Sequence, residues 1–173
     1  MTNATQQQLT EQFVGLGLPR GASVLVHSSL KSLGWVEGGA EAVVQALVDA
    51  VGPEGTVMVP NLPFRGSLSN YLKDEPTFDV RKTPSRMGAI TEALRKRPDA
   101  RRSLHSSHAA AVVGRLQEFM TADHEKCLTT CGEFSPYYKN AHRDDGYVLM
   151  IGVTLRNMTT FPVSYTHLRA HET

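Results

Sequence analysis

The chain has 173 residues, a mass of 19.0 kDa and a formal net charge of +1, with 40% hydrophobic and 20% charged residues, which fits one globular domain or part of a larger one. The balance of 18 Lys plus Arg against 17 Asp plus Glu argues against a broad nucleic-acid-binding surface, and no apolar run approaches the length of about 18 residues that indicates a membrane span. Met1–Gln12 lacks the basic start and apolar stretch of a secretory signal and the chain has only two cysteines, so we expect a reduced, cytoplasmic protein with no membrane or nucleic-acid partner.

Apolar periodicity and Gly or Pro stops predict alternating helices and strands. In chain order we expect a helix within Thr2–Leu16, a strand at Ser23–His27, a loop at Ser28–Gly39, a helix at Ala40–Val51, a strand at Thr56–Pro60, a long loop at Asn61–Thr83, a helix around Ile90–Leu94, a strand at Ala109–Val113, a short helix around Leu116–Met120 and a strand at Tyr147–Val153.

The first two predicted strands are apolar throughout, which is typical of strands buried on both faces. The helix between them is long enough for a right-handed parallel crossover. We therefore predict an α/β fold with a mainly parallel or mixed central sheet and flanking helices.

The loop from Ser28 to Gly39 leaves the carboxyl end of a predicted parallel strand, where open α/β sheets place ligands. It carries three serines and Lys31, and it leads into a helix N-terminus, which favours anions. One interpretation is a phosphate or pyrophosphate cradle. The other is a Ser/Gly-rich loop that caps a helix. The loop is neither a Walker A sequence nor a Gly-x-Gly-x-x-Gly fingerprint.

The segment Arg101–His108 holds two arginines and two histidines. His105 and His108 lack a third partner at metal-ligand spacing, so no metal is expected, and polar contacts to a bound ligand compete with an ordinary polar loop. Arg101 and Arg102 suit either a phosphate or a solvated turn. The two cysteines indicate ordinary thiols, and scattered carboxylates indicate surface acids or a pocket for a polycationic ligand. The residues alone do not reach a reaction.

Several segments in order and spacing resemble the aminoglycoside 3-N-acetyltransferase family, which is distinct from the GNAT acetyltransferases. The resemblance rests on Val26–Gly34, Gly38–Val43, Leu47–Pro60, Phe78–Asp79, Thr83–Gly88, Arg102–His105, Cys131–Glu133, Ser135–Tyr138 and Ile151–Val153.

The resemblance implies transfer of an acetyl group from acetyl-CoA to the 3-amino group of a 2-deoxystreptamine antibiotic, and thus aminoglycoside resistance. It implies that the antibiotic is bound by Phe64 and Asp79, in the long loop. The family chemistry is direct attack of the amine on the thioester, with a histidine backed by a carboxylate as the base. The CoA-binding residues that it implies are His27, Ser28, Ser29, Lys31, Ser32, Thr83, Ser85, Arg86, Arg102, His105 and His108.

The sequence departs from the family pattern near its end. Asn157–Phe161 matches the start of the catalytic motif, but Pro162 stands where the family has its histidine, so no catalytic residue is assigned. We interpret residues 1–162 as the N-terminal part of one acetyltransferase domain, incomplete at the C-terminus, and residues 163–173 as a non-native tail. An inactive fragment is therefore expected. The alternatives are an acetyltransferase for another small amine and a CoA-binding pseudoenzyme.

Overall fold

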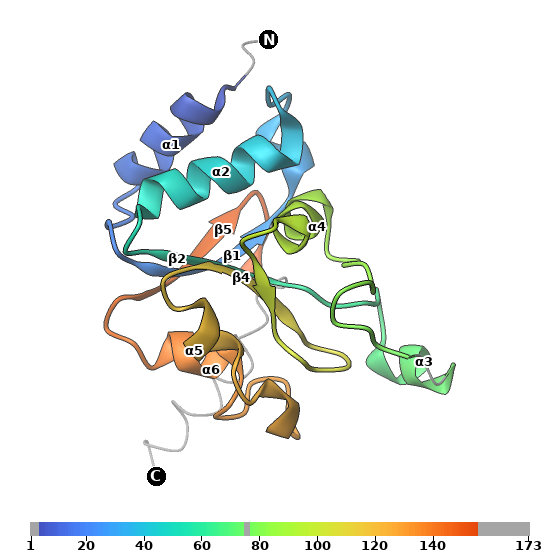
Figure 1. Ribbon diagram of the computed structural model, residues 1–173. Coiled ribbons are helices and arrows are strands. Elements are labelled where there is room, and N and C mark those ends of the chain that lie inside the picture. Colours follow the sequence, from blue (N-terminus) through green and yellow to red (C-terminus); the bar gives the residue numbers. More distant parts are fainter. Residues whose placement is uncertain (1–3, 75–76, 156–173) are drawn as a thin grey trace.

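The centre of the protein is a five-stranded mixed sheet, in a computed structural model that describes residues 4–74 and 77–155 (Figure 1). The strand order is β3-β4-β2-β1-β5; β1 is parallel to β2 and β5, whereas β4 is antiparallel to β2 and β3. The predicted α/β class with a mixed sheet is confirmed. The strands are β1 (Ser23–Ser28), β2 (Thr56–Pro60), β3 (Arg101–Arg102), β4 (Ala110–Gly114) and β5 (Gly146–Ile151).

Helices cover both faces of this sheet. α1, α2 and α4 lie over one face, and α5 and α6 lie over the other (Figure 1). Pro162 and the predicted tail at 163–173 are outside the described residues. The α-helices are α1 (Gln6–Gly15), α2 (Gly39–Val51), α3 (Leu68–Lys73), α4 (Ala89–Lys96), α5 (Gln117–Thr121) and α6 (Pro136–Ala141), and two 3-10 helices are η1 (Leu30–Leu33) and η2 (His124–Lys126).

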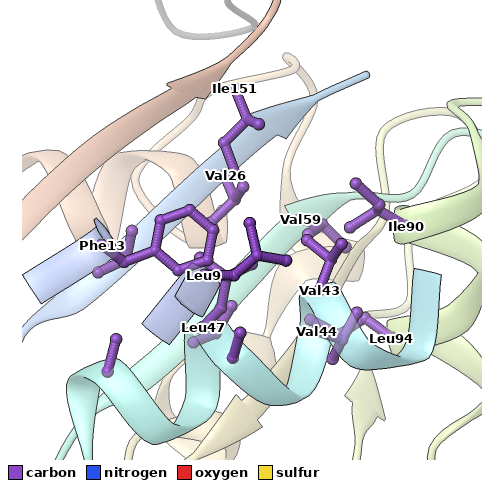
Figure 2. Packing of buried hydrophobic residues seen from close by; sticks show 14 of the residues in the cluster. Leu9, Phe13, Val26, Val43, Val44, Leu47, Val59, Ile90, Leu94 and Ile151 are labelled. Atoms are coloured by element: carbon purple, nitrogen blue, oxygen red, sulfur yellow. The ribbon is translucent and has the colours of Figure 1, made fainter. Parts of the chain in front are cut away.

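The larger hydrophobic core lies between the sheet and the helices α1, α2 and α4. Figure 2 shows Leu47 of α2 beside Leu9 and Phe13 of α1, and Val43 near Val59 of β2. The predicted apolar face of α2 is confirmed, since its helical repeat turns one continuous stripe toward the sheet. No described helix has the length and apolar character required to cross a bilayer.

A smaller core lies on the other face, beneath α5 and α6. It contains Leu25 of β1, Met58 of β2 and Tyr137 of α6. Leu25 faces this core while its neighbours Val24 and Val26 face the larger one, so alternation along β1 places His27 on the α6 side. At the outer strand β5, Tyr147 and Val148 are 40% and 39% exposed.

Two helices arise where the sequence predicted irregular structure. α3 lies inside the predicted long loop, and α6 begins at Pro136, in a stretch where the sequence predicts no helix. The Ser135 hydroxyl accepts a hydrogen bond from the Tyr138 backbone N–H, so Ser135 is the N-cap and Pro136 occupies the first turn. Proline is well tolerated there because that N–H has no helical partner.

Replacing Thr5 by Ala is expected to lower the free energy of unfolding by about 1 kcal/mol. The Thr5 side chain accepts a hydrogen bond from the Gln8 backbone N–H while the Gln8 side chain accepts one from the Thr5 N–H, which completes a capping box at α1. Urea unfolding measures the change. An unchanged midpoint would show that this cap contributes nothing to α1.

Candidate functional site

The carboxyl ends of β1, β2 and β5 and the start of β4 meet at one edge of the sheet. The pairing of β1 with β2 covers only Ser23–Leu25 with Thr56–Met58. Beyond it, β1 stays paired with β5 as far as Ser28, and β2 stays paired with β4 as far as Pro60. The last residues of β1 and β2 are therefore the place where a bound molecule can approach the sheet edge.

The serine loop folds into the short helix η1 rather than running straight into α2. The Ser29 N–H donates to the Ile151 carbonyl at 2.9 Å, and the Ser32 hydroxyl donates to the Ser29 carbonyl at 2.6 Å. Lys31 is exposed. Gly34 and Gly38 have φ of 73° and 76°, a region that residues with a side chain rarely adopt. The serines thus lie beside β5 as well as β1.

Arg102 fastens the long loop to the sheet. Its guanidinium donates to the backbone carbonyls of Thr83 and Val80, and to that of Asn61 at 2.9 Å. It also lies over the Phe78 ring, 4.6 Å from the centroid. Burial and the nearby Arg95 guanidinium lower the Arg102 pKa to about 10. The structure therefore brings Arg102 and Thr83 together, with most guanidinium contacts made to protein carbonyls.

The other predicted residues of this loop form a network with α4. Ser85 donates its N–H to Glu92 at 2.8 Å and shares a hydrogen bond with the Thr91 hydroxyl at 2.9 Å. The Glu92 pKa is lowered to about 2, chiefly because Arg95 donates to its carboxylate. Arg86 contributes its backbone carbonyl to the Arg65 guanidinium at 2.8 Å.

Asp79 organises the loop before Thr83. Its carboxylate accepts hydrogen bonds from the backbone N–H groups of Arg81 at 2.8 Å and Lys82 at 3.0 Å, and these bonds lower its pKa. The Thr83 hydroxyl in turn accepts from the Asp79 N–H at 2.8 Å. One carboxylate oxygen is thus committed to the turn.

Three histidines gather on the α6 side of the sheet. The ring centroids of His105 and His124 are 4.6 Å apart, and those of His105 and His108 are 6.1 Å apart. Phe64 from the long loop stands edge-on to His108 at 5.9 Å, so two predicted residues from distant segments meet here. Tyr137 donates its hydroxyl proton to the Ala109 carbonyl at 3.1 Å and stands edge-on to His124.

Burial keeps these imidazoles neutral. It lowers the pKa of His27 and of His108 to about 4 and that of His124 to about 3, and for the last two, repulsion between the protonated forms of neighbouring histidines also disfavours protonation. Burial also lowers the pKa of His105, and a hydrogen bond to the Cys127 backbone offsets part of that change. A neutral imidazole can accept a proton, which is the property a base requires.

Hollows lie beside Arg102, His105 and Phe64. A cleft of about 750 Å³ contains Arg81, Arg95, Arg101 and Arg102 in its lining. A cavity of about 390 Å³ is lined by six residues: Phe78, Leu104, His105, Ser106, Glu125 and Cys127. A third, of about 600 Å³, contains Phe64, Tyr71, Asp74 and Arg86 in its lining.

Asn61 and His124 belong to this region, although the sequence analysis assigned neither a role. Both are fully buried. Asn61 could have been identified from the sequence, because it is the first residue after a predicted parallel strand, the position where such sheets bind ligands. His124 lies in a polar stretch with no periodicity, so only the tertiary structure reveals it. No cluster of three or more potential metal-ligating side chains occurs among the described residues, and Cys127 and Cys131 are not joined in a disulfide.

The sequence model of the aminoglycoside 3-N-acetyltransferase family matches residues 25–166. The chain belongs to this family. Its resemblance to the family, inferred from the motifs, is therefore confirmed over the serine loop, the long loop and the histidine segment alike.

Two relatives of the family show how much of a full-length member the chain represents. An aminoglycoside N(3)-acetyltransferase III from Salmonella sp is 38% identical over 90% of this chain and 58% of its own length. The SPbeta prophage-derived aminoglycoside N(3')-acetyltransferase-like protein YokD of Bacillus subtilis is 35% identical over 91% and 63%. The chain thus spans about three fifths of the length of these relatives.

Solved structures of family members agree with the fold. The crystal structure of YokD has a TM-score of 0.81 at 34% identity, covering 93% of this chain and 65% of that one. The structure of AAC-IIIb with CoASH has a TM-score of 0.78 at 30% identity, covering 91% and 63%. AAC-VIa bound to sisomicin has a TM-score of 0.76 at 28% identity, covering 91% and 63%.

Proposed function

We propose that this chain carries the acetyl-CoA-binding part of an aminoglycoside 3-N-acetyltransferase. The whole protein would transfer the acetyl group of acetyl-CoA to the 3-amino group of a 2-deoxystreptamine antibiotic in the cytoplasm, and so confer resistance. The observation that carries this proposal is the family match across residues 25–166. The solved relatives with CoASH and with sisomicin support the two ligands.

The described residues fit acetyl-CoA. The cleft with four arginines in its lining offers positive charge to the phosphates of CoA. Next to it, the cavity that contains Phe78, Leu104 and His105 offers apolar and aromatic walls. Unpaired buried polar atoms on His27, Ser28 and Arg102 remain available to a ligand. Arg102 therefore combines the loop contacts described above with one free N–H.

The hollow lined by Phe64, Tyr71 and Asp74 supports an antibiotic-binding role for the long loop. Phe64 and Tyr71 stack with ring centroids 5.0 Å apart, which gives a flat apolar wall of the kind on which sugar rings pack. The exposed Asp74 supplies a carboxylate for the amines of a polycation. We retain Phe64 and Asp79 as proposed antibiotic contacts.

An aminoglycoside amine is mostly protonated at neutral pH, so it needs a base before it can attack the thioester. Pro162 stands where the family motif has its histidine, so we propose that this chain binds acetyl-CoA without turning it over. A positioned base contributes about 10²–10⁴-fold to such a reaction. Acetylation of another small amine is the alternative activity.

Two measurements on the purified chain test the proposal. We expect calorimetry to detect CoA binding, and a thiol-release assay with acetyl-CoA plus kanamycin or gentamicin to detect no product. Turnover of either antibiotic would refute the proposal that this chain lacks a catalytic base. Failure of the folded chain to bind CoA would refute the binding role.

A further inference from the structure

The two edges of the sheet differ in how they are protected. One edge is β3, which has only two residues, both of them arginines. A short, charged edge strand is a common protection against pairing with another chain. The other edge is β5, which has six residues, and none of Gly146–Ile151 is charged or a proline. The β5 edge therefore lacks the features that keep an edge strand from pairing.

Alternate residues of β5 direct their backbone groups away from β1. The Ser29 N–H donates to the Ile151 carbonyl at 2.9 Å, so the backbone groups of Ile151 face β1. Neighbouring residues of a strand direct their N–H and C=O groups to opposite sides, so those of Met150 and Val148 point outward. Within the part of the chain that the structure describes, neither residue has a backbone hydrogen-bond partner on that side.

Side chains on both faces of β5 are apolar. The pairing of β1 with β5 aligns Leu25 with Val148, so Val148 lies on the α6 face with the smaller core. Leu149 packs against the larger core, and Tyr147 is on the same face by alternation. Tyr147 and Val148 remain 40% and 39% exposed. A strand that is apolar on both faces is typical of the inside of a sheet, so β5 is an inner strand in an edge position.

A second copy of the chain fits this edge through a two-fold axis perpendicular to the sheet. Such an axis makes the two β5 strands antiparallel and keeps each side chain on its own face. Only an axis at Val148 pairs the outward-facing residues Gly146, Val148 and Met150 with one another. Val148 then lies opposite Val148 of the second copy, and Tyr147 lies opposite Leu149. The two most exposed side chains of β5 thus meet apolar partners across the axis.

The charges at the two ends of β5 are complementary in this arrangement. The pairing places Asp144 of one copy beside Gly152 of the other. The helix η1 lies at that end, because a Cβ atom on Gly152 would overlap the Ser32 side chain. Lys31, next to Ser32, and Asp144 are both exposed, so opposite charges from the two copies come together at each end of the paired strands. The formal net charge of +1 adds little repulsion between copies.

We propose that two copies of this chain associate through β5 into a two-fold dimer whose sheet continues across the axis. This inference goes beyond the proposed function and does not depend on it. Each outer end of the joined sheet is then a β3 strand, which is short and charged, so the association should stop at the dimer.

Sedimentation equilibrium of the full chain over a range of concentrations measures the association. We expect the mass to rise from 19.0 kDa toward twice that value as the concentration increases. Val148→Lys should raise the dimer Kd roughly tenfold, because the two ammonium groups would lie opposite each other at the axis. Leu128→Lys is the control, since it makes the same change at a side chain that is 100% exposed and outside β5, and it should leave the Kd unchanged.

Disulfide trapping tests the register of the two strands. In a directly opposed pair the Cα atoms are about 5.5 Å apart, which a disulfide spans, so Val148→Cys should be cross-linked by glutathione disulfide. Tyr147→Cys is the control at similar exposure, because two copies of this residue lie diagonally, about 7–8 Å apart, and should not be cross-linked. The native Cys127 and Cys131 are present in both variants and in the wild type, so any cross-links that they form appear equally in all three.

A wild-type chain that stays at 19.0 kDa at every concentration would overturn the inference. Masses that grow beyond the dimer would also overturn it, because they would indicate unspecific aggregation. Equal weakening by Val148→Lys and Leu128→Lys would place the contact outside β5, and equal cross-linking of the two cysteine variants would contradict the two-fold pairing. If Val148→Lys fails to fold, the two cysteine variants decide the outcome, since both replace partly exposed side chains with a smaller one.

Discussion

Lowering the pH from 7 to 5 is expected to remove several kcal/mol from the free energy of unfolding. Burial lowers the pKa of His27 to about 4 and that of His124 to about 3, against 6.5 for a free imidazole. Below pH 6.5 these histidines are therefore protonated in the unfolded chain and neutral in the folded one, so the free energy of unfolding decreases as the pH falls. At pH 5 each of these two histidines accounts for roughly 2 kcal/mol, a large share of a typical domain's stability.

Urea unfolding at half-unit intervals between pH 7.5 and 4.5 measures this effect. Glu92 contributes to stability at a lower pH range. Its pKa is 4.5 in the unfolded chain and about 2 in the folded one, so its contribution is lost as the pH falls from 4.5 toward 2, below the range in which the histidines act. Replacing His124 by Gln should reduce the steepness by about 1.4 kcal/mol per pH unit. A free energy of unfolding that stays constant down to pH 4.5 would show that these imidazoles are protonated in the fold.

The parts of the fold that the sequence predicted are those where periodicity and punctuation agree. The helix α2 has an apolar stripe at helical spacing, the strands β1 and β2 are short apolar runs, and Gly or Pro residues lie between them. This local pattern suffices to place all three elements. The strand β3 escapes prediction because two residues carry no period. Its pairing with β4, and the antiparallel direction of β4, depend on tertiary contacts with no local signature.

In the candidate site, too, local sequence pattern indicates some residues, and only the tertiary structure reveals others. Residues that end a predicted strand, such as His27 and Ser28, could be assigned from the general rule for α/β sheets. For Arg102 the residue types suggest a phosphate contact or a solvated turn, and the structure adds a contact that neither interpretation contains, a guanidinium bonded to loop carbonyls. Contacts to backbone carbonyls cannot be predicted from residue types, because every residue offers the same carbonyl.

Replacing Arg102 by Ala is expected to lower the free energy of unfolding by about 2–4 kcal/mol and to loosen the segment 61–88. The guanidinium binds carbonyls at both ends of this segment and covers Phe78. Hydrogen bonds to a charged donor contribute about 1.5–3 kcal/mol each, and water recovers part of that loss at the freed carbonyls. A longer-lived open loop should be cut faster by trypsin, which has sites at Arg65, Lys73 and Arg81.

Arg101 supplies the matched control for this experiment. It is the neighbouring residue of the same strand, but its side chain is 54% exposed and pairs with Glu118, which is 83% exposed, at 3.1 Å. Such a surface pair contributes little, so Arg101→Ala should change the stability by less than about 0.5 kcal/mol and leave the tryptic pattern unchanged. Because a Lys can reach one carbonyl but not span three, Arg102→Lys should fall between wild type and Arg102→Ala. Equal cleavage rates for Arg101→Ala and Arg102→Ala would mean that the loop is held by α4 alone, through Glu92 and Arg95.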